Sequence, residues 1–142
     1  MLKNNYLSER DSLRKNIADK AASLRQLLDK FYSDDSDGFI SIEDFKGLNL
    51  GQKYYVSDGV YFVPIDFNDE YLEFHTVIQG GYFYGVQWHD KMEICEVSKG
   101  EMVDKISGRT CNVGEKMTFG AFEKHKPGAY VDTESNVKFY LK

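Results

Sequence analysis

The fold of this chain is decided by two stretches, Gly85–Gly100 (GVQWHDKMEICEVSKG) and Gly114–Gly128 (GEKMTFGAFEKHKPG). They contain three side chains able to bind a metal, which are His89, Glu93 and His125. If Glu93 continued the strand that carries His89, a rise of about 3.3 Å per residue would separate them by roughly 13 Å, too far for one ion to bind both. The sequence therefore predicts a turn between them, so that Glu93 returns beside His89 on the next strand, with His125 on a third strand.

The spacing of these residues resembles the two motifs of the cupins, a superfamily of small β-barrels. In the first cupin motif a histidine is followed by a glutamate and, after six more residues, by a glycine, which matches His89, Glu93 and Gly100. In the second motif a glycine precedes a histidine at a fixed interval, which matches Gly114 and His125. The chain departs from the motifs at Gln87, Gly120, Phe122 and Ala129, where cupins have a histidine, a proline, a glycine and often an asparagine. The resemblance implies an all-β fold, the double-stranded β-helix or jelly-roll barrel of the cupins.

The flanking sequences carry a narrower resemblance. The run GQKYYVSDGVYFV and the closing VKFYLK are similar to a bacterial cupin family that includes the sialic-acid anomerase and the small subunit of the evolved β-galactosidase. In that family a histidine, an acid and a second histidine surround a sugar-binding cavity. The resemblance implies the same role for His89, Glu93 and His125, although the family's usual acid is an aspartate one residue further on.

The three residues form a set of two histidines and one carboxylate, to which Gln87 adds a neutral oxygen as a fourth metal ligand. Such a set suits Zn, Fe, Mn or Ni with open positions left for a substrate. The metal would polarise a carbonyl or hydroxyl oxygen of the substrate. Glu93 could instead transfer a proton, since burial beside aromatic side chains raises the pKa of a carboxyl group. A lone histidine in a barrel is often a hydrogen-bonded core residue, but three such groups at this spacing favour a metal or ligand site.

Two hypotheses of function follow from this set. The first is an enzyme on a small sugar or sugar acid, an anomerase, epimerase or isomerase in which Glu93 and His125 are the catalytic residues. The second is a cupin that binds a small ligand without catalysis, its metal site altered by Gln87. Dioxygenase chemistry is a third, supported by the ligand set alone. Cupins host many reactions, so the sequence leaves these alternatives open.

The N-terminal part of the chain has a different pattern. Residues 7–32 carry apolar side chains at steps of three and four, which predicts an amphipathic helix packed on the barrel or against a second subunit. The stretch Ser33–Asp44 resembles a calcium-binding EF-hand loop. Its first and twelfth ligands depart from that motif, which favours a helix end followed by a short helix capped by Ser41 over a calcium site. We therefore expect a helical extension over residues 1–48 and a cupin domain over residues 49–142.

From Gly51 onward, short β-rich runs alternate with turn residues, as expected for a closed or sandwiched all-β fold. Residues 71–78 and 82–89 are joined by Gly80 and Gly81, which predicts a hairpin.

The alternation of side chains in a strand predicts which residues face the interior. If Gln87 and His89 point inward, Phe83 does too. The residues expected on the outer face are Tyr82, Tyr84, Val86 and Trp88. That face is too apolar for water, so either the N-terminal helix or a second subunit covers it, and we expect a homodimer.

Composition excludes several classes of partner. The 142 residues carry a net charge of −5, which argues against binding to nucleic acid or to an anionic membrane. No apolar run reaches the roughly 18 residues of a membrane span, and the first residues contain no signal-peptide core. We expect a cytoplasmic protein that binds a small molecule. Two cysteines are too few for a disulfide framework, and Cys95 should face the same interior as Glu93 as a buried thiol.

Other candidate residues have less specific signals. His75 matches no motif, and we interpret it as structural or pocket-lining. Asp90 and Lys91 lie in the predicted turn, where they could contact an anionic or polyhydroxyl substrate. The aromatic residues that could stack on a sugar are Tyr61, Phe62 and Phe83, although each serves equally well in the core.

Overall fold

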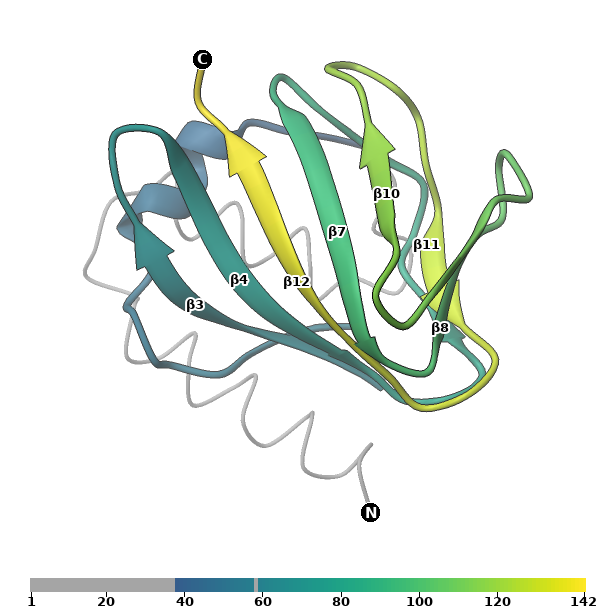
Figure 1. Cartoon of the computed structure of the whole chain (residues 1–142). Helices are drawn as coiled ribbons and strands as arrows, with labels where there is room; N and C mark the ends of the chain where they lie inside the picture. Colours follow the sequence, from purple (N-terminus) through teal and green to yellow (C-terminus); the bar gives the residue numbers. More distant parts are fainter. Residues whose placement is uncertain (1–37, 58) are drawn as a thin grey trace.

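The computed structural model of the chain describes residues 38–57 and 59–142. Figure 1 shows a layer of long strands, among them β4, β7 and β12, that faces a second layer containing β8 and β11. The helix expected over residues 7–32 and the first part of the Ser33–Asp44 stretch lie outside the described residues. In the described part, no helix is long and apolar enough to cross a membrane.

The two layers are antiparallel β-sheets. The first contains, in spatial order, β10 (Lys116–Phe119), β7 (Met92–Lys99), β12 (Thr133–Tyr140), β4 (Tyr71–Ile78), β3 (Val60–Phe67) and β2 (Tyr54–Ser57). The second contains β5 (Tyr82–Phe83), β11 (Pro127–Ala129), β8 (Glu101–Asp104) and β9 (Thr110–Asn112). This arrangement is the all-β jelly roll that the sequence predicts, with neighbouring strands often far apart in the chain.

A short parallel pair closes one end of the sandwich. β1 (Gly38–Ile40) runs beside β6 (Gln87–His89), and an isolated bridge joins Gln87 to His125. The chain then forms a 3₁₀ helix over Ile42–Gly47, the coiled segment beside β3 and β4 in Figure 1. These elements bring three segments of distant sequence together at the same end of the molecule.

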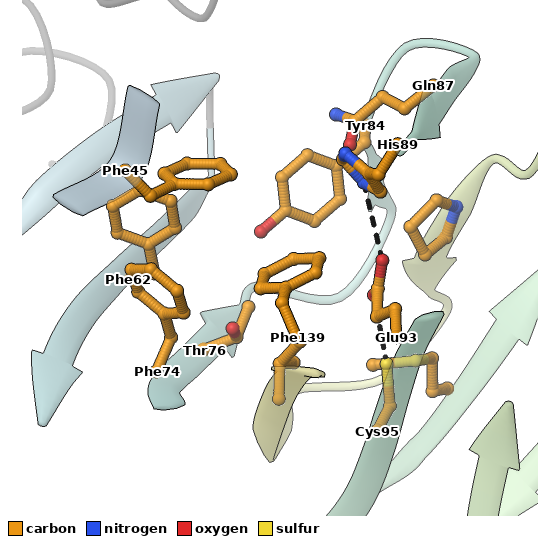
Figure 2. A pocket seen from close by; sticks show the side chains of 13 residues that line it. Phe45, Phe62, Phe74, Thr76, Tyr84, Gln87, His89, Glu93, Cys95 and Phe139 are labelled. Atoms are coloured by element: carbon orange, nitrogen blue, oxygen red, sulfur yellow. Dashed lines mark hydrogen bonds and ion pairs between the residues drawn. The ribbon is translucent and has the colours of Figure 1, made fainter. Parts of the chain in front are cut away.

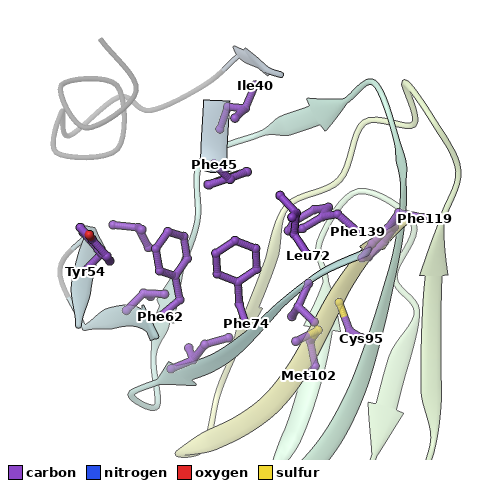
Figure 3. Close-up of a cluster of buried hydrophobic side chains, with 14 of the residues drawn as sticks. Ile40, Phe45, Tyr54, Phe62, Leu72, Phe74, Cys95, Met102, Phe119 and Phe139 are labelled. Carbon is purple, nitrogen blue, oxygen red and sulfur yellow. The ribbon is translucent and has the colours of Figure 1, made fainter. Parts of the chain in front are cut away.

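The hydrophobic core lies between the two sheets. Strands β4 and β12 bury every second residue, as the alternation of apolar and polar residues in their sequences predicts. Figure 3 shows a group of aromatic rings in this core, with centroids 4.9–5.8 Å apart: Phe45, Phe62, Phe74 and Phe139. Fully burying an aromatic side chain contributes roughly 1.5–3 kcal/mol, so this group is a large part of the stability.

The 3₁₀ helix is held by the turn that precedes β7. Its first amide, on Ile42, donates to Asp90 Oδ1 at 2.9 Å, whereas Ser41 makes no capping bond to the helix. Ile42 and Phe45 are buried, so the helix packs its apolar side against the core. The prediction that Ser41 caps this helix is wrong, because a carboxylate brought in by the fold satisfies the free amide.

The predicted hairpin between residues 71–78 and 82–89 does not form. β4 pairs with β3 and β12, whereas β5 pairs with β11 in the other sheet. Gly81, with φ of 94°, turns the chain across the sandwich, and its amide donates to Ala129 O at 2.8 Å. A Gly-Gly pair permits a sharp turn but does not specify which strand follows as a partner.

The expected alternation of faces holds for one part of residues 82–89. Gln87 and His89 are buried and Trp88 is half-buried, as predicted. Tyr84, however, lines an internal cavity. The alternation fails there because β5 ends at Phe83 and the chain is irregular until Gln87.

Candidate metal centre

Three elements position the candidate ligands. His89 is the last residue of β6, and Glu93 is the second residue of β7, after a turn through Asp90 and Lys91. His125 precedes β11 and is held by reciprocal backbone hydrogen bonds of 2.9 Å with Gln87. The predicted turn is therefore present, and the three side chains meet at the closed end of the sandwich.

The ligand atoms converge on one point. His89 Nε2 lies 3.3 Å from Glu93 Oε1, and His125 Nε2 lies 3.2 Å from the same oxygen. The three side chains offer ligand atoms that all lie within 4.8 Å of one another, and each residue is at most 5% exposed. Figure 2 shows His89 above Glu93, with the carboxylate reaching up from β7.

Backbone contacts set the direction of both imidazoles. His125 Nδ1 lies 2.9 Å from Glu123 O, and His89 Nδ1 lies 3.3 Å from Ile40 O. A carbonyl oxygen only accepts, so each Nδ1 carries the proton and donates it. In the neutral ring Nε2 then presents its lone pair toward Glu93, which is the tautomer that a metal ligand needs.

These residues fit a divalent metal. Among the described residues, Glu93 Oε1 and His125 Nε2 are buried atoms without a hydrogen-bond partner. Two lone pairs and a carboxylate oxygen repel one another unless a proton or a metal ion lies among them. Ligand bonds of about 2.1 Å place neighbouring ligand atoms roughly 3.0–3.4 Å apart in octahedral or tetrahedral sites, which matches the distances of 3.3 and 3.2 Å from Glu93 Oε1 to the two imidazoles.

The charges of the group are strongly coupled. Burial opposes ionisation of Glu93, but the adjacent His125 and His89 more than offset this and hold the pKa of its carboxyl below the usual range. Burial also lowers the pKa of His125, and the nearby Glu93 carboxylate reverses that effect and raises the pKa overall. The site therefore favours an ionised carboxylate. The expectation that burial would raise the pKa of Glu93 is wrong, because the two histidines outweigh desolvation.

A second layer of side chains supports the ligands. The Cys95 thiol donates to Glu93 Oε2 at 3.2 Å, and burial together with that carboxylate raises the pKa of the thiol. Cys95 is buried beside Glu93, as the sequence predicts. The ring of Phe119 stacks on His125 at 4.2 Å between ring centroids, and the Arg109 guanidinium lies 5.0 Å from the centroid of the Phe119 ring. Each imidazole and the carboxylate is therefore held by neighbours that are not ligands.

A narrow cavity is lined by two of the three candidate ligands, His89 and Glu93, and has about 40 Å³ of free space. Its apolar walls include Phe45, Phe62, Phe74, Met102, Val137 and Phe139. The polar side chains in its lining, besides His89 and Glu93, are Thr76, Tyr84 and Gln87, with the Cys95 thiol. Figure 2 shows aromatic rings on the side of the cavity opposite His89 and Gln87.

Several residues singled out in the sequence do not belong to the cavity. Asp90 caps the 3₁₀ helix, and His75 lies half-exposed on the six-stranded sheet, bonded to Glu134 and Asn136 at 2.9 and 2.8 Å. Of the three aromatics considered for stacking on a sugar, Phe62 lines the cavity; Tyr61 and Phe83 do not.

Sequence reasoning also missed most of the other residues that line the cavity, and two of them contradict an expectation. Phe45 belongs to the segment expected to be an extension, and Tyr84 was expected on the outer face. No local pattern marks either residue, because both reach the cavity through tertiary packing.

Comparison with known proteins agrees with this architecture. No known family profile and no curated protein matches the sequence. Among solved structures, an RmlC-like cupin from Shewanella frigidimarina is 15% identical, with a TM-score of 0.58 over 65% of this chain and 85% of that chain. KdgF from a Halomonas species is 14% identical, with a TM-score of 0.58 over 64% of this chain and 88% of that one.

An acetylacetone dioxygenase from Acinetobacter johnsonii is 13% identical, with a TM-score of 0.53 over 58% of this chain and 60% of that chain. Identities this low show the fold alone. The chain has the cupin fold, so the fold expected from the two motifs is confirmed. The narrower resemblance to the anomerase family stays a prediction.

Proposed function

We propose that this protein is a metal-binding cupin in which His89, Glu93 and His125 hold one divalent transition metal, Zn, Fe, Mn or Ni. The observation that supports it is the convergence of three buried ligand atoms, two of them without a hydrogen-bond partner. Buried polar atoms are rarely left unpaired, so this arrangement favours an ion at the centre.

Neighbouring groups of the chain fix the orientation of the ligand side chains before an ion binds. The carbonyl groups of Ile40 and Glu123 fix the two imidazole rings, so little conformational freedom is lost when Nε2 binds a metal. The Cys95 thiol donates a hydrogen bond to Glu93 Oε2, and Oε1 is the oxygen that faces the histidines. A metal bound there supplies a Lewis acid that polarises an oxygen of the ligand. The aromatic walls of the cavity exclude bulk water and strengthen these interactions.

The cavity limits the size of the ligand. One buried water needs at least about 10–15 Å³ of free space, so 40 Å³ holds roughly three water-sized groups. The lining is mostly aromatic and aliphatic and offers few partners for hydroxyl groups. The geometry therefore favours a small ligand with one oxygen-bearing end.

A sugar or sugar-acid isomerase or anomerase is the second candidate, with Glu93 and His125 transferring the proton. Its support is the pairing of a carboxylate with an imidazole at 3.2 Å, which is within the range for proton transfer. A sugar is several times larger than three waters, so this function needs the cavity to open. We also propose that the protein is cytoplasmic and forms a homodimer.

Metal titration tests the main proposal, with a control that the chain itself provides. The chain has three histidines, and His75 is bonded away from the site. We expect the wild type and His75→Ala to bind one Zn²⁺ or Mn²⁺ per chain. We expect Glu93→Gln and His125→Ala to lose more affinity than the 10- to 100-fold that removal of a supporting group costs.

Unfolding curves of the metal-free variants establish that each is folded before titration. Absence of stoichiometric metal in the wild type, or equal loss in His75→Ala, would contradict the proposal. Turnover assays then separate an enzyme from a binding protein. An enzyme loses turnover in Glu93→Gln, whereas no turnover of any tested compound by the metal-loaded wild type favours a ligand-binding cupin.

A further inference from the structure

The proposed metal centre does not account for the side-chain amide of Gln87, whose nitrogen, Nε2, has no hydrogen-bond partner. Gln87 is 4% exposed and lines the cavity. The backbone of Gln87 is fixed on both sides by the hydrogen bonds to His125. A buried donor held in place without an acceptor indicates that the acceptor comes from a bound molecule.

The unpaired atom is the nitrogen of the amide. An amide NH₂ group donates two hydrogen bonds and offers no lone pair to a metal, so Nε2 cannot serve as the fourth ligand. The sequence predicts that Gln87 binds the metal through its amide oxygen, and this stays a prediction. The unpaired nitrogen favours an additional contact to the ligand that the metal would bind.

The other polar groups of the cavity are already occupied. The Tyr84 hydroxyl is hydrogen bonded to Thr76, and burial together with the Glu93 carboxylate raises the pKa of this phenol, so it stays protonated. The Cys95 thiol donates to Glu93. Among the polar side chains that line the cavity in the described part of the chain, the Gln87 amide nitrogen is a buried donor that has no hydrogen-bond partner of any kind.

The two sides of the cavity differ in character. Figure 2 shows Gln87 beside His89 on one side and the rings of Phe45, Phe62 and Phe74 on the other. A metal cation and an amide donor on the first side favour an oxygen-rich, anionic group that only accepts hydrogen bonds. The aromatic side favours hydrocarbon.

We propose that this cavity binds a short-chain carboxylate, with its carboxylate between the metal and Gln87 Nε2 and its hydrocarbon tail among the aromatic rings. This inference rests on the proposed metal centre and names the class of ligand for it. The free space of about 40 Å³ limits the tail to one or two carbons. Polyhydroxylated acids are disfavoured, because their hydroxyl groups would lose water without gaining partners.

Calorimetric titration of the zinc-loaded, full-length protein tests the inference. The probes are formate, acetate, propanoate and gluconate. We expect affinity to rise about fourfold with each added carbon from formate to propanoate, as burial of hydrocarbon requires. We expect no binding of gluconate at the concentration that saturates the site with propanoate. Equal affinities for formate and propanoate, or tighter binding of gluconate, would overturn the inference.

The variant Gln87→Leu removes the amide and keeps a side chain of similar size. We expect propanoate to bind about tenfold more weakly, the loss typical of one hydrogen bond to a charged group, with zinc affinity unchanged. The exposed Gln79→Leu is the matched control and should behave as the wild type. A loss of zinc affinity in Gln87→Leu, or unchanged propanoate affinity, would show that the amide does not bind the ligand.

The zinc titration that precedes the ligand titrations separates the two proposals. Failure of the wild type to bind zinc rejects the metal centre itself. Normal zinc binding without the dependence on tail length rejects the carboxylate and leaves the metal centre standing. If Gln87→Leu does not fold, the series of acids on the wild type still decides.

Discussion

Asp104 is a buried carboxylate whose removal should destabilise the protein and loosen the segment that carries His125. It is fully buried and accepts four hydrogen bonds. Oδ1 accepts from the amides of Ile106 at 3.2 Å and Lys126 at 2.7 Å. Oδ2 accepts from the amide and the hydroxyl of Ser107 at 3.2 and 2.7 Å. The carboxylate thus ties the turn after β8 to the residue next to His125.

The substitution Asp104→Asn keeps the shape and removes the charge. The best placement of the new NH₂ group is toward Ser107, whose hydroxyl can turn and accept from it. The Ser107 amide then loses its acceptor, at a cost of about 1–3 kcal/mol, and the remaining bonds weaken by roughly 0.5 kcal/mol each because they are no longer charge-assisted. We expect a loss of about 3 kcal/mol in the free energy of unfolding, or about 10 °C in Tm.

The same carboxylate predicts a dependence on pH. Burial opposes ionisation of Asp104, but its hydrogen bonds, beginning with that from Lys126, hold its pKa below the usual value. A lowered pKa in the folded state means that the stabilisation is complete above the unfolded pKa of about 3.9 and is lost as the pH falls through the folded value. The difference between wild type and Asp104→Asn should therefore be constant near pH 7 and shrink below about pH 4.

Urea unfolding of both proteins, followed by circular dichroism between pH 7 and pH 3, measures this difference. The conservative exposed change Asp69→Asn serves as a control for the loss of one surface charge. A difference of less than 1 kcal/mol at pH 7, or one that does not change toward pH 3, would refute the reasoning.

Two further predictions concern the support of the site and the core. Arg109 and Glu123 form an ion pair of 2.9 Å beside the segment that carries His125, and both side chains are about two-fifths exposed. We expect Arg109→Ala to weaken zinc binding by about two- to fivefold, since an exposed pair contributes at most about 1 kcal/mol. In a protein that already carries Glu123→Gln, the same substitution should weaken zinc binding no further. Additive losses in the double variant would exclude coupling through the pair. Phe74 is 1% exposed and contacts four other aromatic rings. We expect Phe74→Ala to lower the free energy of unfolding by about 3–5 kcal/mol without changing zinc affinity, and a loss below 1 kcal/mol by urea denaturation would show that the core is not packed as described.

The local chemistry of the site could be predicted because its elements are short and its spacing is constrained. The four-residue step from His89 to Glu93 requires a turn if one centre is to hold both, and the structure has that turn. The interior position of Cys95 follows from its place two residues after Glu93 on one strand. The motif glycine Gly100 lies in the turn after β7 with φ of 78°, a conformation that favours glycine.

What sequence alone determined here is therefore the all-β class, most of the strands, the cupin motifs and the identity of the three candidate ligands. Tertiary structure decided which strands pair, because alternation specifies the face of a strand and not its neighbour. It also decided that Phe45 and Tyr84 line the cavity and that Asp90 caps a helix. These positions depend on contacts between residues far apart in the chain, such as the 2.9 Å bond from Ile42 to Asp90, and no local pattern encodes such a contact.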